Sequence, residues 1–258
     1  MSITYRKGGI LSDLQQEKFE IEVYGYTIIK NVLPENLASE MRDVLIHLDQ
    51  QHGTDHRHLG TARHIANLPT YNPIFFQTID HSKVLPLIEH FMGLDIILGS
   101  LNARIVRPND PIQHLHGDIP QPLIKKSAEF PVMMNTVWML DEFTPEIGAT
   151  RIVPGSHKSG YAQTPEGMEI KNVQTAIAPV GSVLIFNGQC WHGGGANTSN
   201  RDRHALFGHY RNGSWMRFQC DPHHRFEPKW LNLLTDRQKK LLRMENGIES
   251  KIAADFYE

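Results

Sequence analysis

The residues best suited to chemistry lie in a short stretch, QHLHGD, that ends in His116, Gly117 and Asp118. In an extended chain, residues two positions apart point to the same side, so an imidazole and a carboxylate here could bind one metal ion. A third ligand is then needed. His192 is the best candidate, because it ends a β-rich run and precedes three glycines that leave room for a ligand. Two histidines and one carboxylate form the facial triad of non-haem iron(II) enzymes, which leaves coordination positions open.

This spacing alone does not separate a metal site from ordinary histidines. An isolated H-x-D pair is common by chance, and a single histidine on an apolar strand is more often a core or surface residue. The metal site is favoured by the segment after His192, which carries Asn197, Ser199 and Arg203. An arginine at that place can bind a dicarboxylate through two parallel charge-assisted hydrogen bonds. Arg201 has the same strand parity as Arg203, so the pattern leaves the choice between them open.

The first third of the chain is predicted to be helical. One amphipathic helix should begin at Pro34, because proline suits the first turn of a helix and apolar residues follow at helical spacing (Leu37, Met41, Leu45 and Leu48). A shorter helix should open at a capping box formed by Ser12 and Gln15, and a third should cover residues 83–92. Between the first two, the β-branched stretch GYTIIK at 25–30 predicts an edge strand.

After the third helix the sequence changes to short β-rich runs separated by proline, asparagine and glycine, among them DIILGSLNARIVRP, FPVMMNTVWML, GSVLIFNG and HALFGHYR. Short strands without long helices between them predict an all-β sandwich or barrel, not a parallel sheet. The tail then returns to helix, with Thr235 as a candidate N-cap. We therefore expect a single domain over residues 1–258, with helices over about 1–94, a β core over about 95–220 and a helical tail over about 221–258.

The composition narrows the classes of function. Lys+Arg 26 against Asp+Glu 28 gives a formal charge of −2, and 40% hydrophobic residues suffice for a sizeable core. A near-neutral chain without a basic block is not expected to bind nucleic acid, and no apolar run has the length of a membrane span or a signal sequence. The two cysteines, Cys190 and Cys220, cannot form a disulfide framework. We expect a cytoplasmic protein whose partner is a small molecule.

Three blocks of the sequence resemble the phytanoyl-CoA dioxygenase family of Fe(II)/2-oxoglutarate oxygenases, and its natural-product biosynthesis members in particular. The resemblance covers roughly residues 15–220. It rests on HGD at 116–118, WMLDEFTPEIGATRIVPGSH at 138–157 and GSVLIFNGQCWHGGGANTSNRDR at 181–203. A PGSH turn, a WH dipeptide and an arginine eleven positions after that histidine are seldom found together elsewhere. The resemblance implies a mainly β fold with flanking helices around a double-stranded β-helix (jelly-roll, cupin-like) core.

The same resemblance implies the main site residues. His116, Asp118 and His192 match the iron ligands. Arg203 matches the residue that binds the distal carboxylate of 2-oxoglutarate, which favours it over Arg201. Halogenating relatives replace the carboxylate ligand with a small residue, so the presence of an aspartate implies oxygenation.

Other positions match with less specific roles. Thr150 matches a residue that can hydrogen-bond the same carboxylate, and Gln113 matches a glutamine that contacts the cofactor near the metal. Trp138 matches a tryptophan close to the cofactor, although a core aromatic in a strand is at least as good an interpretation. Gly194 departs from several relatives, which carry a serine there, and Thr150 is the candidate replacement for that hydroxyl.

The activity implied by the resemblance uses Fe(II), 2-oxoglutarate as cosubstrate and O2. A small-molecule metabolite, expected to belong to secondary metabolism, would be hydroxylated, desaturated, epoxidised or cyclised, with release of succinate and CO2. The pocket should be apolar with a few polar groups, and its candidate covers are residues 52–71, residues 160–174 and the tail from 221. The histidines between His52 and His64 are expected to lie in a solvated loop, not in a second metal site.

Two functions of other classes remain open at this point. One is a non-catalytic protein that binds metal or 2-oxoglutarate on the same fold, although such a relative would be expected to have lost a ligand. The other is a zinc-dependent cupin-like hydrolase or isomerase, because two histidines and a carboxylate also suit zinc. Hydrolysis would require a positioned general base, and Arg203 would be unexplained. A homodimer formed through the C-terminal helix is a further expectation.

Overall fold

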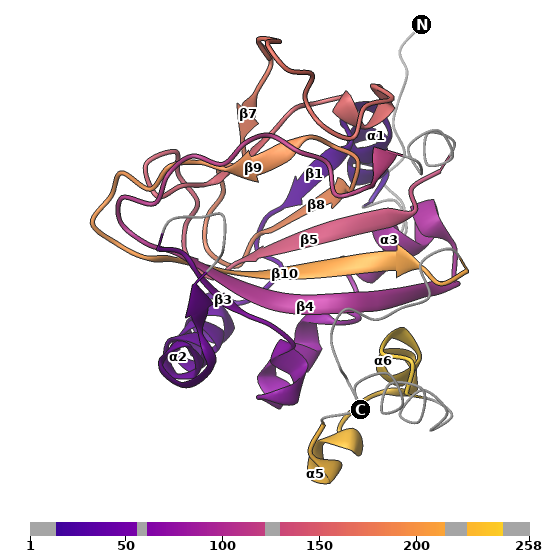
Figure 1. Cartoon of the computed structure of the whole chain (residues 1–258). Coiled ribbons are helices and arrows are strands. Elements are labelled where there is room, and N and C mark those ends of the chain that lie inside the picture. Colours follow the sequence, from indigo (N-terminus) through magenta and orange to yellow (C-terminus); the bar gives the residue numbers. More distant parts are fainter. Residues whose placement is uncertain (1–13, 56–60, 122–129, 215–225, 245–258) are drawn as a thin grey trace, which may run out of the picture.

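The computed structural model describes residues 14–55, 61–121, 130–214 and 226–244. Two antiparallel sheets face each other, and helices cover the outer side of the larger sheet (Figure 1). The helices are α1 (Gln15–Tyr24), α2 (Glu35–His52), α3 (Leu85–Met92), α5 (Pro228–Leu231) and α6 (Asp236–Leu241), with 3₁₀ turns at Leu68–Thr70, Pro73–Thr78 and Ser156–Lys158. The strands are β1 (Tyr26–Ile29), β2 (Thr54–Asp55), β3 (Arg63–Ile65), β4 (Ile96–Val106), β5 (Met133–Met139), β6 (Thr150–Ile152), β7 (Gln174–Thr175), β8 (Val183–Asn187), β9 (His192–Gly194) and β10 (Arg203–Asn212).

The strand order confirms the predicted jelly-roll architecture. The large sheet runs β1-β8-β5-β10-β4-β3-β2 and the small sheet β7-β6-β9, with antiparallel pairing throughout. From β5 to β10 the chain passes repeatedly between the two sheets, because β5, β8 and β10 belong to the large sheet and β6, β7 and β9 to the small one. This winding stacks the two sheets face to face, as in other double-sheet jelly rolls.

The space between the sheets is apolar at one end. Val137 and Met139 of β5 and Leu184 of β8 pack there against Ile152 of β6 in one buried cluster. Residues on a strand alternate between its faces, so their neighbours in sequence point to the opposite side of the large sheet. The interior cluster thus joins the two sheets and closes one end of the space between them.

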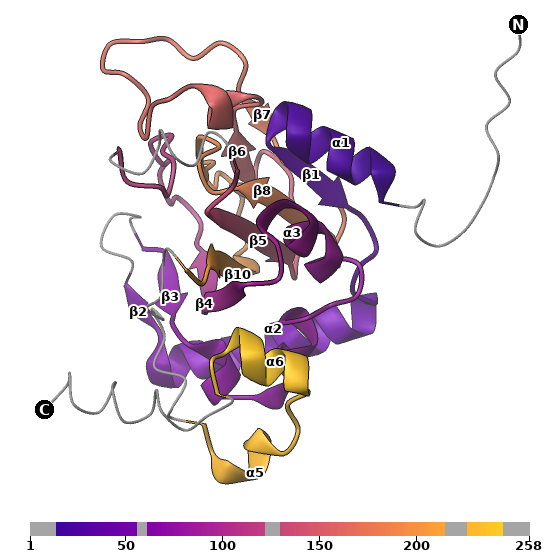
Figure 2. The ribbon, with the colours of Figure 1, turned by 90° about the vertical axis from the view of Figure 1, so that its right-hand side faces the viewer.

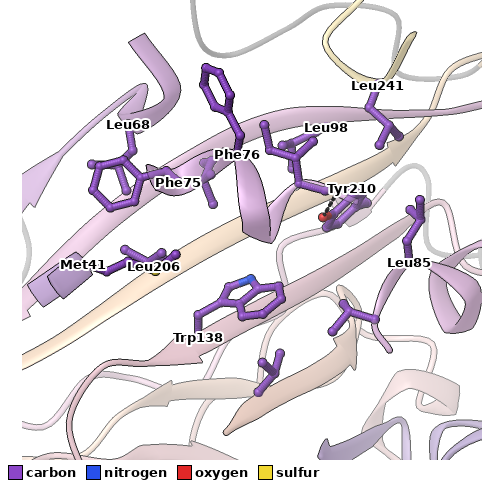
Figure 3. Packing of buried hydrophobic residues seen from close by; sticks show 14 of the residues in the cluster. Met41, Leu68, Phe75, Phe76, Leu85, Leu98, Trp138, Leu206, Tyr210 and Leu241 are labelled. Carbon is purple, nitrogen blue, oxygen red and sulfur yellow. Dashed lines mark hydrogen bonds between the residues drawn. The ribbon is translucent and has the colours of Figure 1, made fainter. Parts of the chain in front are cut away.

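A second and larger cluster lies between the large sheet and the helices. Trp138, Leu206 and Tyr210 point outward from β5 and β10 and pack with Met41 of α2 (Figure 3). The Tyr210 hydroxyl donates to the carbonyl of Ile79 at 2.7 Å, so its polar atom is satisfied inside the core. This side of the sheet is a conventional hydrophobic core.

The helical predictions agree with the structure to within one or two residues. α2 begins directly after Pro34 and buries Met41, Leu45 and Leu48, as the apolar spacing predicted. α3 ends at Gly93, where φ is +76°. The predicted cap of the tail helix is confirmed by a capping box between Thr235 and Gln238 at the start of α6.

The remaining helix prediction is confirmed only in part. α1 begins at Gln15, and its N-cap is Leu14 without a side-chain hydrogen bond, so Gln15 is not the third helical residue that the expected capping box requires. Ser12 itself lies outside the described residues. Figure 2 shows α1 and α3 beside the sheets and α2, α5 and α6 beneath the large sheet. None of the helices in the described part of the chain combines the length and apolarity of a membrane span.

Candidate active site

The two candidate histidine ligands are held side by side by backbone hydrogen bonds. The amide of His116 donates to the carbonyl of His192 at 2.9 Å, and the amide of His192 donates back to His116 at 2.8 Å. Two residues further on, the amide of Asp118 donates to the carbonyl of Gly188 at 2.7 Å, which fixes this segment against the end of β8. The segment that carries HGD is thereby attached to both sheets.

These three side chains converge as the sequence predicted. Nε2 of His116 lies 3.7 Å from Oδ1 of Asp118, and Nε2 of His192 lies 3.6 Å from Oδ2 of the same carboxylate. Their candidate ligand atoms all lie within 4.8 Å of one another. Among the described residues this is the one group of three or more histidine, cysteine or acidic side chains so placed.

Each imidazole is oriented by a hydrogen bond at Nδ1, the ring nitrogen that does not face Asp118. Nδ1 of His116 lies 3.1 Å from the carbonyl of His114, and Nδ1 of His192 lies 2.9 Å from the carbonyl of Cys190. Since a carbonyl can only accept, both Nδ1 atoms donate, so each imidazole in its neutral form has a lone pair on Nε2, the nitrogen closer to Asp118. Such a support for the ring is typical of metal-binding histidines.

The carboxylate of the site is kept ionised. Burial alone would raise the pKa of Asp118, but His192, His209 and His116 and a 2.6 Å hydrogen bond from Asn135 together lower it. An ionised carboxylate between two Nε2 lone pairs suits a divalent cation.

Arg203 begins β10 and is only 2% exposed. Its Nε and Nη1 atoms are buried and have no hydrogen-bond partner among the described residues, and its guanidinium lies 4.6 Å from the centre of the Phe143 ring. Burial, and secondarily the charge of Arg104, lower the pKa of Arg203 to about 9, so it is still a cation at neutral pH. A buried cation without an ion pair is unfavourable, and a bound carboxylate would satisfy it. The arginine therefore fits the distal carboxylate of 2-oxoglutarate.

The loop before β10 explains why Arg203 and not Arg201 is placed inside. Nδ2 of Asn197 donates to the carbonyl of Arg201 at 2.8 Å, and the backbone amide and hydroxyl of Ser199 both donate to Oδ1 of Asn197. This turn leaves Arg201 exposed, two residues before the strand begins. Asn197 and Ser199 thus stabilise the turn that places Arg203 inside the protein.

Gln113, Thr150 and Gly194 lie together on the small-sheet side of the site. Oε1 of Gln113 accepts from the amide of Gly194 at 2.8 Å, and Thr150 is the cross-strand neighbour of Gly194. A Cβ atom added to Gly194 would lie 3.2 Å from Cδ of Gln113. A serine at this position would therefore crowd the glutamine, which accounts for the departure from several relatives.

These predicted residues line one cavity, which has about 630 Å³ of space free of atoms, part of it the open mouth. The predicted residues that line it are His116, Asp118, His192, Arg203, Thr150 and Gln113.

Trp138 lies elsewhere, and its predicted place near the cofactor is corrected by the structure. It is 0% exposed and lies in the helix-facing core, with Nε1 donating to the Thr136 hydroxyl at 3.2 Å (Figure 3). The physical reason is strand alternation: Val137 and Met139 point between the sheets, so the residue between them points to the helices. The alternative interpretation, a core aromatic, describes Trp138 correctly.

The lining residues that the sequence analysis missed include Arg104, Phe207 and His209. Phe207 and His209 have the same strand parity as Arg203, so an inward Arg203 could have identified both. Burial, together with the charges of Arg104 and Arg211, outweighs the effect of Asp118 and lowers the pKa of His209 to about 4, so this ring is neutral near pH 7. Arg104 had no comparable signal, because nothing in the sequence fixes which face of β4 it occupies.

The expected cover segments are described only in part. His52 ends α2 and stacks on Tyr71 with ring centroids 4.5 Å apart, and His64 lies in β3, so neither lies in the solvated loop that the sequence predicted. Residues 56–60 and 221–225 lie outside the described residues. Within the described part of the chain, no second metal-binding cluster is present.

Comparison with known proteins gives a consistent result. A family model described as phytanoyl-CoA dioxygenase (PhyH) matches residues 21–205. An uncharacterised protein of Mycobacterium tuberculosis is 26% identical over 223 residues, which cover 81% of this chain and 79% of that protein. The dioxygenase af480 of Aspergillus fumigatus is 28% identical over 153 residues, covering 55% of this chain and 46% of the fungal protein.

A solved structure shows the same fold. HygX from Streptomyces hygroscopicus, with nickel, 2-oxoglutarate and hygromycin B bound, superposes with a TM-score of 0.65. It is 18% identical in sequence, and the match covers 76% of this chain and 86% of HygX.

Proposed function

The chain belongs to the phytanoyl-CoA dioxygenase (PhyH) family, and we propose that it works as an Fe(II)/2-oxoglutarate-dependent dioxygenase on a small-molecule metabolite. In this proposal His116, Asp118 and His192 bind the iron, and Arg203 binds the distal carboxylate of 2-oxoglutarate. The observation that carries the proposal is that a convergent His-Asp-His triad and a buried, unpaired arginine line the same pocket.

The residues of the chain contribute binding and orientation. When bound, iron and 2-oxoglutarate supply the oxidising chemistry, in which O2 is consumed and succinate and CO2 are released. The carbonyls that accept from the two Nδ1 atoms hold His116 and His192 in the tautomer needed for ligation. Asn135 holds one oxygen of Asp118, and Gln113 positions the backbone of Gly194 beside Thr150. Little further acid–base chemistry is required of the protein.

The class of substrate is proposed from the relatives. HygX binds hygromycin B, and several matching fungal proteins are dioxygenases. These proteins support a small natural product as the substrate and a role in secondary metabolism. The interior face of β10 adds aromatic and polar groups, Phe207 and His209, for contact with such a molecule.

The pocket gives less support to a zinc hydrolase. Apart from Asp118, Asp110 is the carboxylate that lines it among the described residues. Asp110 already accepts from the Thr61 amide at 2.7 Å, the Thr61 hydroxyl at 2.8 Å and the Arg107 amide at 2.6 Å. It is therefore poorly placed to act as a general base, and a hydrolase would leave Arg203 without a role.

A direct test measures 2-oxoglutarate binding and succinate release in the presence of Fe(II) and ascorbate. We expect the wild type to bind 2-oxoglutarate and to release succinate slowly alone and faster with a substrate. Arg203→Leu should weaken 2-oxoglutarate binding about 100-fold, because charge-assisted bidentate pairs are strong, whereas the exposed neighbour Arg201→Leu should leave it unchanged. The proposal would be wrong if the wild type bound no 2-oxoglutarate and showed hydrolytic activity with zinc alone.

A further inference from the structure

A second arginine, Arg104, lines the same pocket. It lies on β4, is half-buried, and its guanidinium carbon lies 5.0 Å from the centre of the Phe207 ring. Its side chain makes no hydrogen bond or ion pair with any described residue. The pocket therefore contains two cations without a carboxylate partner among the described residues, Arg203 at the start of β10 and Arg104 on the neighbouring strand.

The cosubstrate accounts for only one of these arginines. 2-Oxoglutarate has two carboxylates, and in the proposed function one pairs with Arg203 while the other lies at the His-Asp-His triad. Once iron and 2-oxoglutarate are bound, Arg104 still lacks an anion.

The strand register shows where such an anion would lie. Across the β4–β10 pair, Val106 is opposite Arg203, Arg104 is opposite Ala205, and Asn102 is opposite Phe207. Arg104 therefore lies further along the sheet than Arg203 and lines the same pocket as the triad. Burial lowers the pKa of Arg104, and the negative charge of Asp118 acts in the opposite direction, so the guanidinium lies within electrostatic reach of the triad.

We propose that Arg104 binds a carboxylate of the substrate, so that the substrate is a small organic acid oxidised at a carbon close to its acid group. The proposal rests on the proposed function and adds a specificity-determining residue to it. The Phe207 ring lies beside the guanidinium, and a planar fork held in this way favours a carboxylate bound through two parallel hydrogen bonds. A neutral substrate would leave a partly desolvated cation unpaired, which is unfavourable.

The proposal can be tested without knowledge of the natural substrate. The protein is loaded with Ni(II) and 2-oxoglutarate, and the binding of phenylacetate, benzoate and butanoate is compared with that of their primary amides by calorimetry and thermal melting. We expect the acids to bind and to raise the melting temperature, and the amides to bind at least about tenfold more weakly.

Variants then assign the effect to Arg104. Arg104→Gln should weaken acid binding about tenfold or more and remove the preference for acids over amides, and Arg104→Lys should retain part of it, because lysine keeps the charge but not the planar fork. Arg107→Gln is the matched control, since it removes the same charge three residues along the chain from a partly exposed pair with Asp49. This control should bind acids as the wild type does. Arg107→Gln should bind 2-oxoglutarate with unchanged affinity, and the Arg104 variants should still bind it.

Several outcomes would overturn the inference. It is wrong if no acid binds, if acids and amides bind alike, or if Arg104→Gln retains the preference for acids. A loss of 2-oxoglutarate binding in Arg104→Gln would assign the residue to the cosubstrate instead. If the wild type itself binds no 2-oxoglutarate, the proposed function fails, whereas intact 2-oxoglutarate binding without a preference for acids overturns only the role of Arg104.

Discussion

The two faces of the large sheet differ in whether their polar side chains have hydrogen-bond partners, and adjacent residues of β10 show the difference. His204 points to the helices, where its Nδ1 lies 2.7 Å from Asp141, which also accepts from Arg42 at 2.9 Å. Arg203 points between the sheets and has two buried nitrogens without a described partner. The same contrast holds between Tyr210, which donates to a backbone carbonyl, and His209, whose ring forms no hydrogen bond with the described residues.

Within one strand, the side chains of one face therefore contribute mainly to stability and those of the other face mainly to ligand binding. The helix-facing side has its polar atoms paired and buries the largest side chains, so it is expected to determine the free energy of unfolding. The interior side keeps unpaired charges that lower stability and become satisfied when ligands bind. Substitutions on the two faces should therefore have opposite consequences.

The largest effect is expected for Trp138→Ala on the helix-facing side. Removal of this fully buried side chain should lower the free energy of unfolding by about 3–5 kcal/mol, while the folded variant still binds 2-oxoglutarate. Chemical denaturation measures the first quantity and calorimetry the second. Phe207→Ala, at a half-buried interior position, should cost less. A larger loss of unfolding free energy for Phe207→Ala than for Trp138→Ala would contradict the view that the helix-facing side determines stability.

A smaller loss is expected for Asp141→Asn, which removes the charge that holds His204 and Arg42. Burial raises the pKa of Asp141, but the hydrogen bonds and charge of His204 and the bond from Arg42 outweigh it and lower the pKa below its usual 3.8. At pH values between the native pKa of Asp141 and 3.8, the unfolded chain thus binds more protons than the native chain. The stabilisation by the Asp141 carboxylate is therefore complete above pH 3.8 and is lost as the pH falls through the native pKa. The variant should be about 1–3 kcal/mol less stable at pH 7, and the gap should shrink toward pH 3. Urea unfolding between pH 3 and pH 7 would show this, and a gap that does not change with pH would contradict it.

On the interior face, a substitution that removes a polar side chain should not lower the free energy of unfolding. Arg203→Leu removes an unpaired buried cation, so without 2-oxoglutarate the variant should be as stable as the wild type or more stable by about 1 kcal/mol. With saturating 2-oxoglutarate only the wild type should gain stability, because binding to the native state raises the free energy of unfolding. A variant that is strongly destabilised without 2-oxoglutarate would show that Arg203 has a structural role.

The smallest effect concerns the apolar part of the interior, which is closed to solvent. Cys190 is fully buried, and burial raises the pKa of its thiol to about 11, so at pH 8 it is neutral. In a Cys220→Ser background we expect no reaction of the folded protein with a disulfide reagent at pH 8 and full reaction after denaturation. Rapid labelling of the folded protein would show that this end of the space between the sheets is open.

Much of this comparison could be predicted from the sequence. The change from helical to β-rich patterns predicted a β sandwich or barrel with flanking helices, and the spacing of His116 and Asp118 predicted that both point to one side. The choice of His192 as the third residue rested also on the family resemblance. Trp138 was more difficult, because a β-rich run gives the alternation of faces but not which face is inside. Arg104 could not be found for a related reason: Leu98 of β4 lies in the helix-facing core, whereas Arg104, of the same parity, lines the pocket.

Leu98 and Arg104 face opposite sides of the sheet because β4 contains a β-bulge between them. The register between β4 and β10 shifts at His209 and Tyr210, which face Ser100 and Leu98, so the Cα pairing skips Gly99. One extra residue in a strand moves the following side chains to the other face. A glycine inside a β-rich run, such as Gly99, is a general signal of a bulge. It does not show to which face the following side chains turn, so the interior position of Arg104 follows only from the folded pairing.

The central claim is that His116, Asp118 and His192 bind a metal ion in the pocket that the interior face of the large sheet helps to line. Anaerobic equilibrium dialysis with Fe(II) and 2-oxoglutarate tests it most directly, with His192→Ala compared with His114→Ala. His114 is an exposed imidazole two residues before His116, and its substitution keeps the backbone carbonyl that His116 uses. We predict one iron per chain in the wild type and in His114→Ala, and none in folded His192→Ala. Unchanged iron binding by His192→Ala would contradict the account.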